Sequence, residues 1–570
     1  MVAEKQPAQT DPQARLAAHL KAAGPARLPL QRVVRLLADG PRSLAELVRL
    51  SALPRRTIQE LLEVLTPDVI SDTSGLRIRP EVASDYRGKV TEPMRRHPPV
   101  TELASPEAGL DAGLLAKMAE LIAAAPRPTA ALDHVPATAE TALRRALWLE
   151  ATYGLSERRI LLVGDHDLTA LALLLVRPEA AVTVVDVDER LLAFLARQAR
   201  GFGGTVRCLF ADLRHGLPPA VAGWADVVVT DPPYTPAGVR LFCTRGLQGL
   251  RDRQQGRLVV AYGFGEHQPT LGLQVQRAIQ QLHLVFGAIL PGFNRYHGAQ
   301  AVGSASDLYV CQPTPQTWKA LERHAEAADT NIYTHGRQSL EAAEAEGAPA
   351  VLDALWRTGG PAARVLTVGP GLATTPVAVP VEQHVHATVA TVLTAGPPRA
   401  TRGEATQLVL ANLGDDPGGW LLRLLLAVHA HRVVALLPAT HPDLDGGAIS
   451  PEVARATAPK YTLDSPRTVP DTEYVLVLVE KVEDAQLDST QRLVRRLLER
   501  PHGTVAAVWR ESLVALGTEL GLGPVTKNQA RAIIRALDAP QELLEARLVD
   551  LPRDRLAELR ELLAQSVQPG

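Results

Sequence analysis

The tetrapeptide Asp231-Pro232-Pro233-Tyr234 carries the most specific chemical signal in the sequence. Two consecutive prolines restrict the backbone of this loop and so fix the directions of its carbonyl groups. Asp231 can then accept a hydrogen bond from an amine, and a neighbouring carbonyl can accept a second one. The ring of Tyr234 can lie near the cationic centre that develops when a nitrogen attacks. We therefore predict that this loop orients a nitrogen nucleophile, with Asp231 and Tyr234 catalytic and Pro232 at the bound donor.

Acidic residues also follow the predicted strands that precede this tetrapeptide. Asp186, with Asp188 two residues on, follows one strand, and Asp212 follows the next. Because ligands of a doubly wound sheet lie beyond the carboxyl ends of its strands, these acids are expected at one site. Asp186 suits the hydroxyl groups of a ribose, and Asp212 suits the amino group of an adenine. In this order, and with Gly164 after the first strand, they resemble the nucleoside-binding half of a class I methyltransferase.

The loop after the first strand reads Gly164-Asp165-His166-Asp167-Leu168. In class I methyltransferases a glycine-rich loop at this place meets the methionine moiety of the donor, whose carboxylate is negative. Here two carboxylates flank a histidine, and they would repel a carboxylate and attract an ammonium. We therefore expect a donor without the carboxylate and a polycationic acceptor, with Asp165, His166 and Asp167 orienting the substrate and removing a proton.

Short apolar segments that alternate with helical ones are expected to position these residues. Strands are predicted at 159–163, 181–185, 205–210, 225–229 and 257–261. This alternation is typical of a Rossmann-like parallel sheet covered by helices on both faces. Glu266 and His267 lie just beyond the fifth strand and are expected to line the channel for the amine.

The chain beyond about residue 330 predicts a second, degenerate α/β region up to 484 and a helical region from 485 to 570. Its strands are expected at 364–368, 407–411, 432–437 and 474–479, and its helices at 491–498, 505–516, 527–537 and 542–563. The segment 411–417 either echoes a ligand loop in a decayed copy of the first region or is an ordinary turn before a helix.

The segment 28–90 has the pattern of a winged helix-turn-helix, preceded by a leader over 1–27 that is expected to be disordered. Ser43 and Glu46 are spaced as a capping box that opens the second helix, and residues 69–78 are expected to form the wing. One interpretation places the start of the third helix on DNA, through Arg55, Arg56 and Gln59. The other, which we favour because this helix is weakly basic, is a module that packs on a neighbour or dimerises, so a homodimer stays open.

Composition sets limits on the function. The chain has 570 residues, 46% hydrophobic and 21% charged, with a formal net charge of −2, so it offers no global attraction to a nucleic acid. Its three cysteines are widely spaced and predict neither a disulfide framework nor a zinc site, and we expect no metal cofactor. An apolar leader and a membrane span are both missing from the pattern, so a cytoplasmic protein is expected.

With these motifs the chain resembles a known family over about residues 28–325: the branched-chain polyamine synthases, or N4-bis(aminopropyl)spermidine synthases. The loop at 164–168 is similar to the Gly-Asp-Asp-Asp-Leu loop of that family, with His166 in place of its middle acid. Further matches lie at 87–89, 138–141, 231–235, 241–246, 294–298 and 303–310. The family also carries an N-terminal winged helix, whereas the residues beyond 325 are not covered by the resemblance.

The resemblance implies that residues 91–325 form a Rossmann-like aminopropyltransferase domain. Its reaction would transfer an aminopropyl group from decarboxylated S-adenosylmethionine to the nitrogen of a polyamine such as spermidine and release methylthioadenosine. An imidazole at position 166 can still accept a proton near neutral pH. Two alternatives remain open: a methyltransferase that uses S-adenosylmethionine on adenine N6 or cytosine N4 of a nucleic acid, and a catalytically decayed regulator that senses polyamines.

Overall fold

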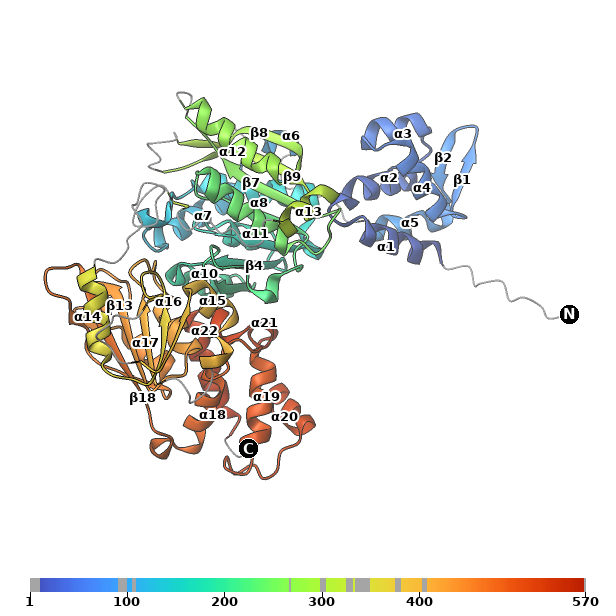
Figure 1. Ribbon diagram of the computed structural model, residues 1–570. Coiled ribbons are helices and arrows are strands. Elements are labelled where there is room, and N and C mark those ends of the chain that lie inside the picture. Colours follow the sequence, from blue (N-terminus) through green and yellow to red (C-terminus); the bar gives the residue numbers. More distant parts are fainter. Residues whose placement is uncertain are drawn as a thin grey trace.

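The computed structural model describes residues 11–90, 100–104, 109–265, 268–297, 304–323, 332–333, 349–374, 381–401 and 407–567. Figure 1 shows a small N-terminal body, a first α/β region and a second α/β region that continues into helices. Among the helices of the described segments, none combines the length and the apolar character needed to cross a bilayer.

Helices and one hairpin make up the N-terminal body. In chain order they are α1 (Pro12–Ala22), α2 (Arg27–Asp39), α3 (Leu44–Ser51), α4 (Arg55–Leu65), β1 (Val69–Asp72), β2 (Gly75–Ile78) and α5 (Pro80–Lys89). The predicted capping box opens α3. The Ser43 hydroxyl accepts from the Glu46 N–H at 3.2 Å, and the Glu46 carboxylate accepts from the Ser43 N–H at 2.8 Å.

The expectation of a disordered leader over 1–27 is wrong for its second half, which forms α1 and the start of α2. Asp11 caps the first turn of α1 by accepting from the Gln13 N–H at 3.2 Å. Leu16 and Leu20 are buried in the core that the N-terminal helices share. The Ala/Pro/Gln-rich composition concealed this helix, because two leucines four residues apart are enough to anchor one face.

The first α/β region contains the strands β3 (Arg159–Val163), β4 (Ala181–Asp186), β5 (Val206–Phe210), β6 (Val227–Thr230), β7 (Arg257–Tyr262), β8 (Val285–Arg295) and β9 (Ala305–Gln312). Within the described residues they form one sheet in the order β5-β4-β3-β6-β7-β9-β8. The five strands from β5 to β7 are parallel, and β9 runs antiparallel to both of its neighbours. This is a Rossmann-like mixed sheet, and the predicted strands lie within it.

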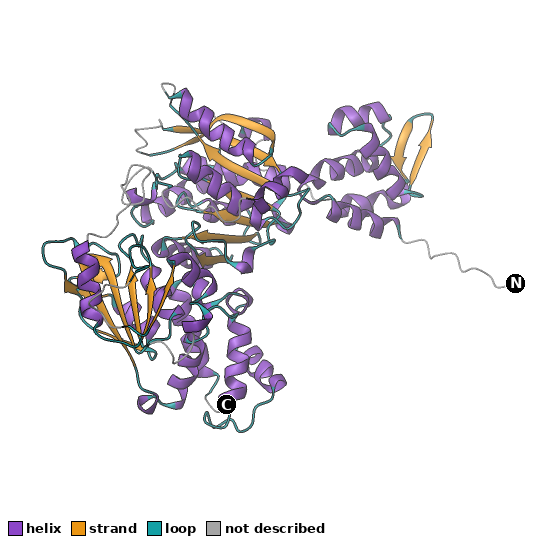
Figure 2. Cartoon of the chain, viewed as in Figure 1, coloured by secondary structure: helices purple, strands orange, loops and turns teal. Residues whose placement is uncertain are grey.

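Helices cover both faces of this sheet (Figure 2). They are α6 (Val100–Leu103), α7 (Ala112–Ala124), α8 (Ala139–Tyr153), α9 (Thr169–Val176), α10 (Glu189–Gly201), α11 (Pro236–Gly249), α12 (Pro269–Gln281) and α13 (Pro315–Arg323). Because side chains alternate along a strand, Ile160 and Leu162 join the core under α8, α9 and α10, whereas Leu161 and Val163 join the core under α11 and α12.

The second α/β region has its own mixed sheet in the order β11-β10-β12-β13-β18-β16, with β17 paired to β18. Its strands are β10 (Arg364–Val368), β11 (Gln383–Ala387), β12 (Leu408–Asn412), β13 (Arg432–Pro438), β16 (Tyr461–Leu463), β17 (Arg467–Thr468) and β18 (Tyr474–Lys481). A separate two-stranded ladder joins β14 (Leu444–Asp445) to β15 (Ala448–Ile449). Its helices are α14 (Pro349–Gly359), α15 (Val389–Ala395), α16 (Trp420–Ala427) and α17 (Pro451–Thr457).

The chain then continues as helices, with one difference from the prediction. The helices are α18 (Ser489–Leu498), α19 (Val505–Leu516), α20 (Lys527–Ala536), α21 (Gln541–Glu545) and α22 (Arg553–Gln565). The prediction of a single helix over 542–563 is wrong, because the α-helix is interrupted between the end of α21 and the start of α22. Pro552 stands at the break, and a proline cannot donate the N–H that a continuing helix requires.

Candidate active site

The loops that follow β3, β4, β5 and β6 surround a pocket at the carboxyl edge of the first sheet. Its empty volume is about 490 Å³. Its polar lining residues are four aspartates, two histidines and one tyrosine: Asp133, Asp186, Asp212, Asp231, His134, His166 and Tyr333. Among the described residues, neither lysine nor arginine lines this pocket. Its wall therefore favours a cation over an anion.

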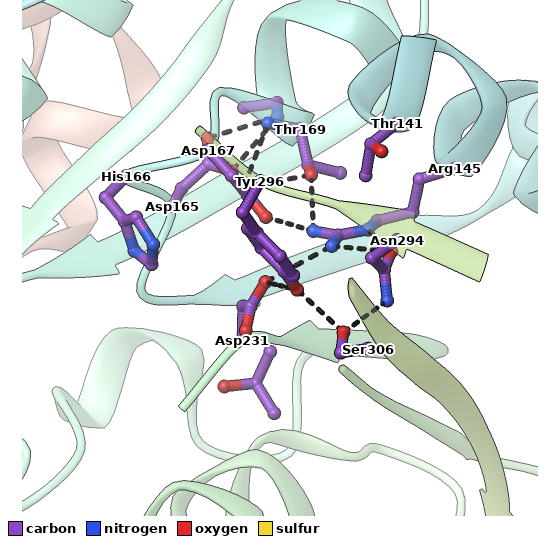
Figure 3. A network of polar contacts seen from close by, with 12 residues as sticks. Thr141, Arg145, Asp165, His166, Asp167, Thr169, Asp231, Asn294, Tyr296 and Ser306 are labelled. Carbon is purple, nitrogen blue, oxygen red and sulfur yellow. Dashed lines mark hydrogen bonds and ion pairs between the residues drawn. The ribbon is translucent and has the colours of Figure 1, made fainter. Parts of the chain in front are cut away.

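Asp231 is held at this edge by three donors, of which Tyr296 and Arg145 are labelled in Figure 3. Tyr296 donates to its Oδ2 at 2.7 Å, Arg145 donates to the same oxygen at 3.2 Å, and Tyr234 donates to its Oδ1 at 3.1 Å. Burial raises the pKa of Asp231, and the Arg145 guanidinium offsets only part of this rise. The carboxylate is thus oriented and is more basic than a carboxylate in water.

The Asp-Pro-Pro-Tyr loop differs in detail from the prediction. Pro233 lines the pocket, whereas Pro232 is buried and is not among the lining residues. Tyr234 contributes its hydroxyl to Asp231, and its ring packs edge-on against Tyr262 with centroids 5.3 Å apart. The roles assigned to these residues stay predictions, and the geometry brings Asp231 and the Tyr234 hydroxyl together.

Arg145 is the centre of the network, and the sequence interpretation did not include it. Its guanidinium, from α8, is fully buried and pairs with Asp167 as well as with Asp231. Asn294 Oδ1 accepts from Arg145 Nη2 at 2.9 Å, and the Thr169 hydroxyl accepts from Nη1 at 3.1 Å. The two adjacent arginines of α8, Arg144 and Arg145, were the available signal, because the residues around them are mostly apolar and an unpaired buried charge is rarely tolerated.

Two further polar residues of the network, Asn294 and Ser306, stand on β8 and β9. The Asn294 amide donates to the Ser306 hydroxyl at 2.9 Å, and that hydroxyl lies 2.9 Å from the Tyr296 hydroxyl (Figure 3). All three residues fall in stretches that carry the family resemblance. The resemblance marked these stretches but gave the residues no role.

In the loop after β3 the two carboxylates face the protein. Asp165 accepts from the Ala170 N–H at 3.1 Å and so caps the start of α9. Burial raises its pKa well above the ordinary value. Burial also opposes ionisation of Asp167, but the Arg145 guanidinium outweighs it and lowers the pKa of Asp167 to about 2. Neither carboxylate lines this pocket, although Asp167 lines an adjoining cavity, so direct contact of these two acids with a substrate stays a prediction.

His166, between those acids, does line the pocket. Its ring stacks on His134 with centroids 4.9 Å apart and planes 6° from parallel. Its Nε2 lies 3.1 Å from the Val135 carbonyl oxygen. Because a carbonyl only accepts, Nε2 carries the proton and Nδ1 is the nitrogen left to accept one. Burial lowers the pKa of His134 to about 3, and the neighbouring His166 adds to this effect.

Asp186 and Asp188 occupy the loop after β4 in different ways. Asp186 lines the pocket and accepts from the backbone N–H groups of Asp188 at 2.8 Å and Asp165 at 3.1 Å. Burial raises the pKa of Asp186 to about 6 against those hydrogen bonds. Asp188 instead caps α10, pairs with Arg190 and lines an adjoining cavity of about 690 Å³ rather than this pocket.

Gly164 and Asp212 line the pocket, but the acceptor sites of Asp212 are already filled. Gly164 has φ of +75°, a conformation that favours glycine. Oδ1 of Asp212 accepts from the Arg214 N–H at 3.0 Å and Nε at 2.9 Å. Its Oδ2 accepts from Arg214 Nη2 at 2.5 Å and from the Trp420 indole at 3.1 Å. A contact with an adenine amino group therefore stays a prediction that requires sharing one of these oxygens.

Glu266 and His267 lie outside the described residues. Among the residues that the structure does describe, no group of three histidine, cysteine or acidic side chains is arranged to hold a metal ion.

Known proteins resemble this part of the chain. Residues 113–324 match the family model of the branched-chain polyamine synthase A C-terminal domain. An uncharacterised protein of Methanocaldococcus jannaschii is 35% identical over 176 residues, which are 31% of this chain and 44% of that one. The N4-bis(aminopropyl)spermidine synthase of Thermus thermophilus is 32% identical over 215 residues, 37% of this chain and 60% of that one. That of Thermococcus kodakarensis is 31% identical over 189 residues, 32% of this chain and 52% of that one.

The match is thus partial on both sides, since the chain spans about half the length of these curated relatives. One solved structure is that of the branched-chain polyamine synthase C9 mutein from Thermus thermophilus, in complex with N4-aminopropylspermidine and 5′-methylthioadenosine. It is 24% identical and covers 53% of this chain and 93% of that one, with a TM-score of 0.33. Residues 113–324 match the branched-chain polyamine synthase family, and the chain is distantly similar to N4-bis(aminopropyl)spermidine synthases over about a third of its length.

Proposed function

We propose that the first α/β region transfers an aminopropyl group from decarboxylated S-adenosylmethionine to a polyamine nitrogen and releases methylthioadenosine. The observation that carries this proposal is the charge of the pocket, which four aspartates line and which no lysine or arginine of the described residues lines. Both substrates are cations, one a sulfonium with an ammonium and the other a polyammonium. The names of the curated relatives over this segment support the same reaction.

The chemistry asks two things of these residues. The attacking nitrogen forms a C–N bond as the C–S bond breaks, and sulfur keeps the electron pair and leaves as a neutral thioether. A polyamine nitrogen is mostly protonated at pH 7, so the enzyme must select and hold its neutral form. The nitrogen sheds a proton after attack, which calls for a base within hydrogen-bond reach.

Asp231 and His166 are the two candidate bases. Asp231 is oriented by Tyr234, Tyr296 and Arg145, and burial makes it a better proton acceptor than an ordinary carboxylate. The Nδ1 atom of His166 is available because Nε2 is engaged with Val135. In this proposal Asp231 orients the nucleophile, and His166 replaces the acid that the family loop carries at this position.

Mass spectrometry of products tests the proposal directly. The full chain is incubated with decarboxylated S-adenosylmethionine or S-adenosylmethionine and with a panel of polyamines that includes spermidine. We expect aminopropylated products from the decarboxylated donor only. Calorimetric titration should show tighter binding of that donor, because the carboxylate of S-adenosylmethionine would face an acidic wall. Methylated products, or tighter binding of S-adenosylmethionine, would contradict the proposal.

A second candidate function is a protein that binds polyamines or a nucleoside without turnover. The filled acceptor sites of Asp212 favour it, since the donor would find one of its expected contacts already used. The same experiment separates the two, because a sensor binds polyamine in the titration and yields no product in the mass spectrum.

We further propose that α2, α3, α4 and the β1–β2 hairpin form a winged helix-turn-helix that does not bind DNA tightly. Arg55 and Arg56 are exposed at the start of α4, but Arg56 is paired with Glu60 at 3.0 Å. Two arginines, one of them paired, supply little of the phosphate neutralisation on which DNA affinity depends. Fluorescence polarisation with random and selected duplexes at physiological salt should show no sequence-specific dissociation constant in the nanomolar range.

A further inference from the structure

The side chain of Trp420 reaches from the second α/β region into the wall of the pocket of the first. Its indole Nε1 donates to Asp212 Oδ2 at 3.1 Å, and both side chains are buried. Trp420 begins α16 and lies outside the segment 113–324 that matches the family. A residue outside the catalytic segment therefore completes the hydrogen bonding of a pocket residue.

Trp420 is fixed in place by its own loop. The Asp416 carboxylate accepts from the backbone N–H groups of Gly418 at 2.8 Å, Trp420 at 3.1 Å and Leu421 at 2.9 Å. Gly419 has φ of +118°, and a Cβ atom there would lie 2.7 Å from the Phe210 ring. The loop can approach the end of β5 this closely only because the residue is glycine.

The indole ring also determines where Arg214 lies. The Arg214 guanidinium packs over the ring at 5.1 Å from its centroid, and the His215 ring lies 5.0 Å away at a tilt of 43°. Arg214 pairs with Asp212, and although Asp212 and Leu213 line the pocket, Arg214 does not. Trp420 therefore backs the Arg214 guanidinium, which does not line the acidic pocket, and this cation–π contact contributes stability.

The second α/β region and α22 also hold the loop after β4. Glu189, the first residue of α10, pairs with Arg423 of α16 and accepts from the Arg553 N–H at 2.8 Å. Both loops that carry the pocket acids Asp186 and Asp212 are thus anchored from outside the first region. These contacts are partly buried, and charged hydrogen bonds in such surroundings are geometrically demanding.

We infer that Trp420 is a positioning residue for the nucleoside end of the pocket, so that affinity for the cationic donor depends on the second α/β region. The inference rests on the proposed function only in its choice of an adenine nucleoside as ligand. Trp420 donates to the Asp212 carboxylate, and its ring backs the Arg214 guanidinium that pairs with the same carboxylate. Without the indole N–H, the Asp212 carboxylate loses the donor that reaches it from the second α/β region.

The test uses the full chain and three probes: decarboxylated S-adenosylmethionine, S-adenosylmethionine and the neutral methylthioadenosine. Trp420→Phe keeps the ring and removes the N–H donor. We expect the dissociation constant of the decarboxylated donor to rise roughly five- to tenfold, the scale of one hydrogen bond to a charged group. Methylthioadenosine should weaken to a similar extent, because it carries the same adenine, and turnover at saturating donor should stay within about twofold.

Two matched variants separate positioning from general stability. Glu545→Gln breaks the contact between Arg207 and Glu545, an ion pair of 3.6 Å between the two regions that does not touch Asp212, and it should leave all three affinities unchanged. In an Asp212→Ala background, Trp420→Phe should add no further loss of affinity. Thermal unfolding confirms that each variant is folded, and Trp420→Tyr, which keeps more volume, replaces Trp420→Phe if that chain does not fold.

The outcomes distinguish the inference from the proposed function. Unchanged donor affinity in Trp420→Phe, or an equal loss in Glu545→Gln, overturns the inference. If the wild type binds S-adenosylmethionine more tightly than the decarboxylated donor, the proposed function falls. The inference is then decided by the dissociation constants of the variants for S-adenosylmethionine relative to that of the wild type. If the wild type binds none of the three probes, the inference falls together with the assignment of the pocket to a nucleoside.

Discussion

The two α/β regions of this protein share the order and directions of five strands. In the first, β4-β3-β6-β7 are parallel and β9 follows antiparallel, and in the second, β11-β10-β12-β13 are parallel and β18 follows antiparallel. The pairing registers make positions comparable. Val163 pairs with Val185 and Thr230, and Val368 pairs with Ala387 and Ala411.

The two regions differ in the residues that directly follow these paired positions at the carboxyl ends of the strands. Asp186 and Asp231 in the first region correspond by register to Thr388 and Asn412 in the second. Asn412 uses both ends of its amide within the protein: it donates to the Pro370 carbonyl at 3.0 Å and accepts from the Gly414 N–H at 3.1 Å. The same topology therefore supports an acidic pocket in one region and closed loops in the other, so function depends on the side chains and not on the fold.

Removal of Arg145 should have the largest effect. Arg145→Gln leaves Asp167 and Asp231 buried without their cation, which costs about 3–5 kcal/mol. We expect faster hydrogen–deuterium exchange throughout β3 and β6 but unchanged exchange in β10 and β12. The exposed pair of Arg357 with Asp353 in the second region supplies the control, since Arg357→Gln should cost below about 1 kcal/mol. Equal protection of both sheets in Arg145→Gln would show that this guanidinium does not stabilise the first region.

A reciprocal exchange at the register-equivalent positions tests the comparison most directly. Asp231→Asn keeps the size of the side chain but removes the charge that stabilises the developing ammonium, so turnover should fall roughly a hundredfold or more with donor affinity nearly intact. Asn412→Asp should leave turnover unchanged and lower stability by about 1–3 kcal/mol, because a carboxylate would replace the donor to the Pro370 carbonyl. Saturation kinetics and urea unfolding of both variants provide the two measurements.

The sequence predicted those features that are local in the chain. The strands β3 to β7 of the first sheet and β10, β12, β13 and β18 of the second follow from short apolar runs, whereas β8, β9, β11, β16 and β17 were not predicted. The start of α3 follows from Ser43 and Glu46, which lie three residues apart. The acids at successive strand ends follow in the same way, because their positions depend only on where strands stop. The break before α22 was missed, although Pro552 is a local signal for it.

What the sequence could not predict depends on contacts between distant residues. Arg145 meets Asp167, Asp231 and Asn294 across separations of 22, 86 and 149 residues. Trp420 meets Asp212 across 208 residues and two different sheets. Hydrophobic periodicity describes which face of an element is buried but not which element packs against it, so neither pairing was accessible from the pattern.

Asp186→Asn should weaken the donor about tenfold with less effect on turnover at saturation, since its carboxylate is assigned to the ribose hydroxyls. The wild type should also lose donor affinity as the pH falls through about 6, the value to which burial raises the pKa of Asp186 from 3.8. The sign follows because protonation removes the charge and part of the acceptor capacity of the carboxyl group. Calorimetric titrations of the donor into the wild type and into Asp186→Asn, at pH values from about 5 to about 8, check both the loss of affinity and its pH dependence. A pH dependence that persists unchanged in Asp186→Asn would assign it to another group.

Thr388→Ala, the matched change in the second region, should have the smallest effect. The Thr388 hydroxyl accepts from the Thr391 N–H at 3.1 Å and so caps α15. Loss of such a cap costs about 1 kcal/mol. Donor affinity and its pH dependence should both remain those of the wild type, because Thr388 lies at the edge of the second sheet and does not line the acidic pocket. A change of donor affinity in Thr388→Ala would mean that the second sheet contributes to ligand binding at its own strand ends. The comparison of an acidic site with a closed one would then fail, because the second region would hold a site that its side chains at 388 and 412 do not reveal.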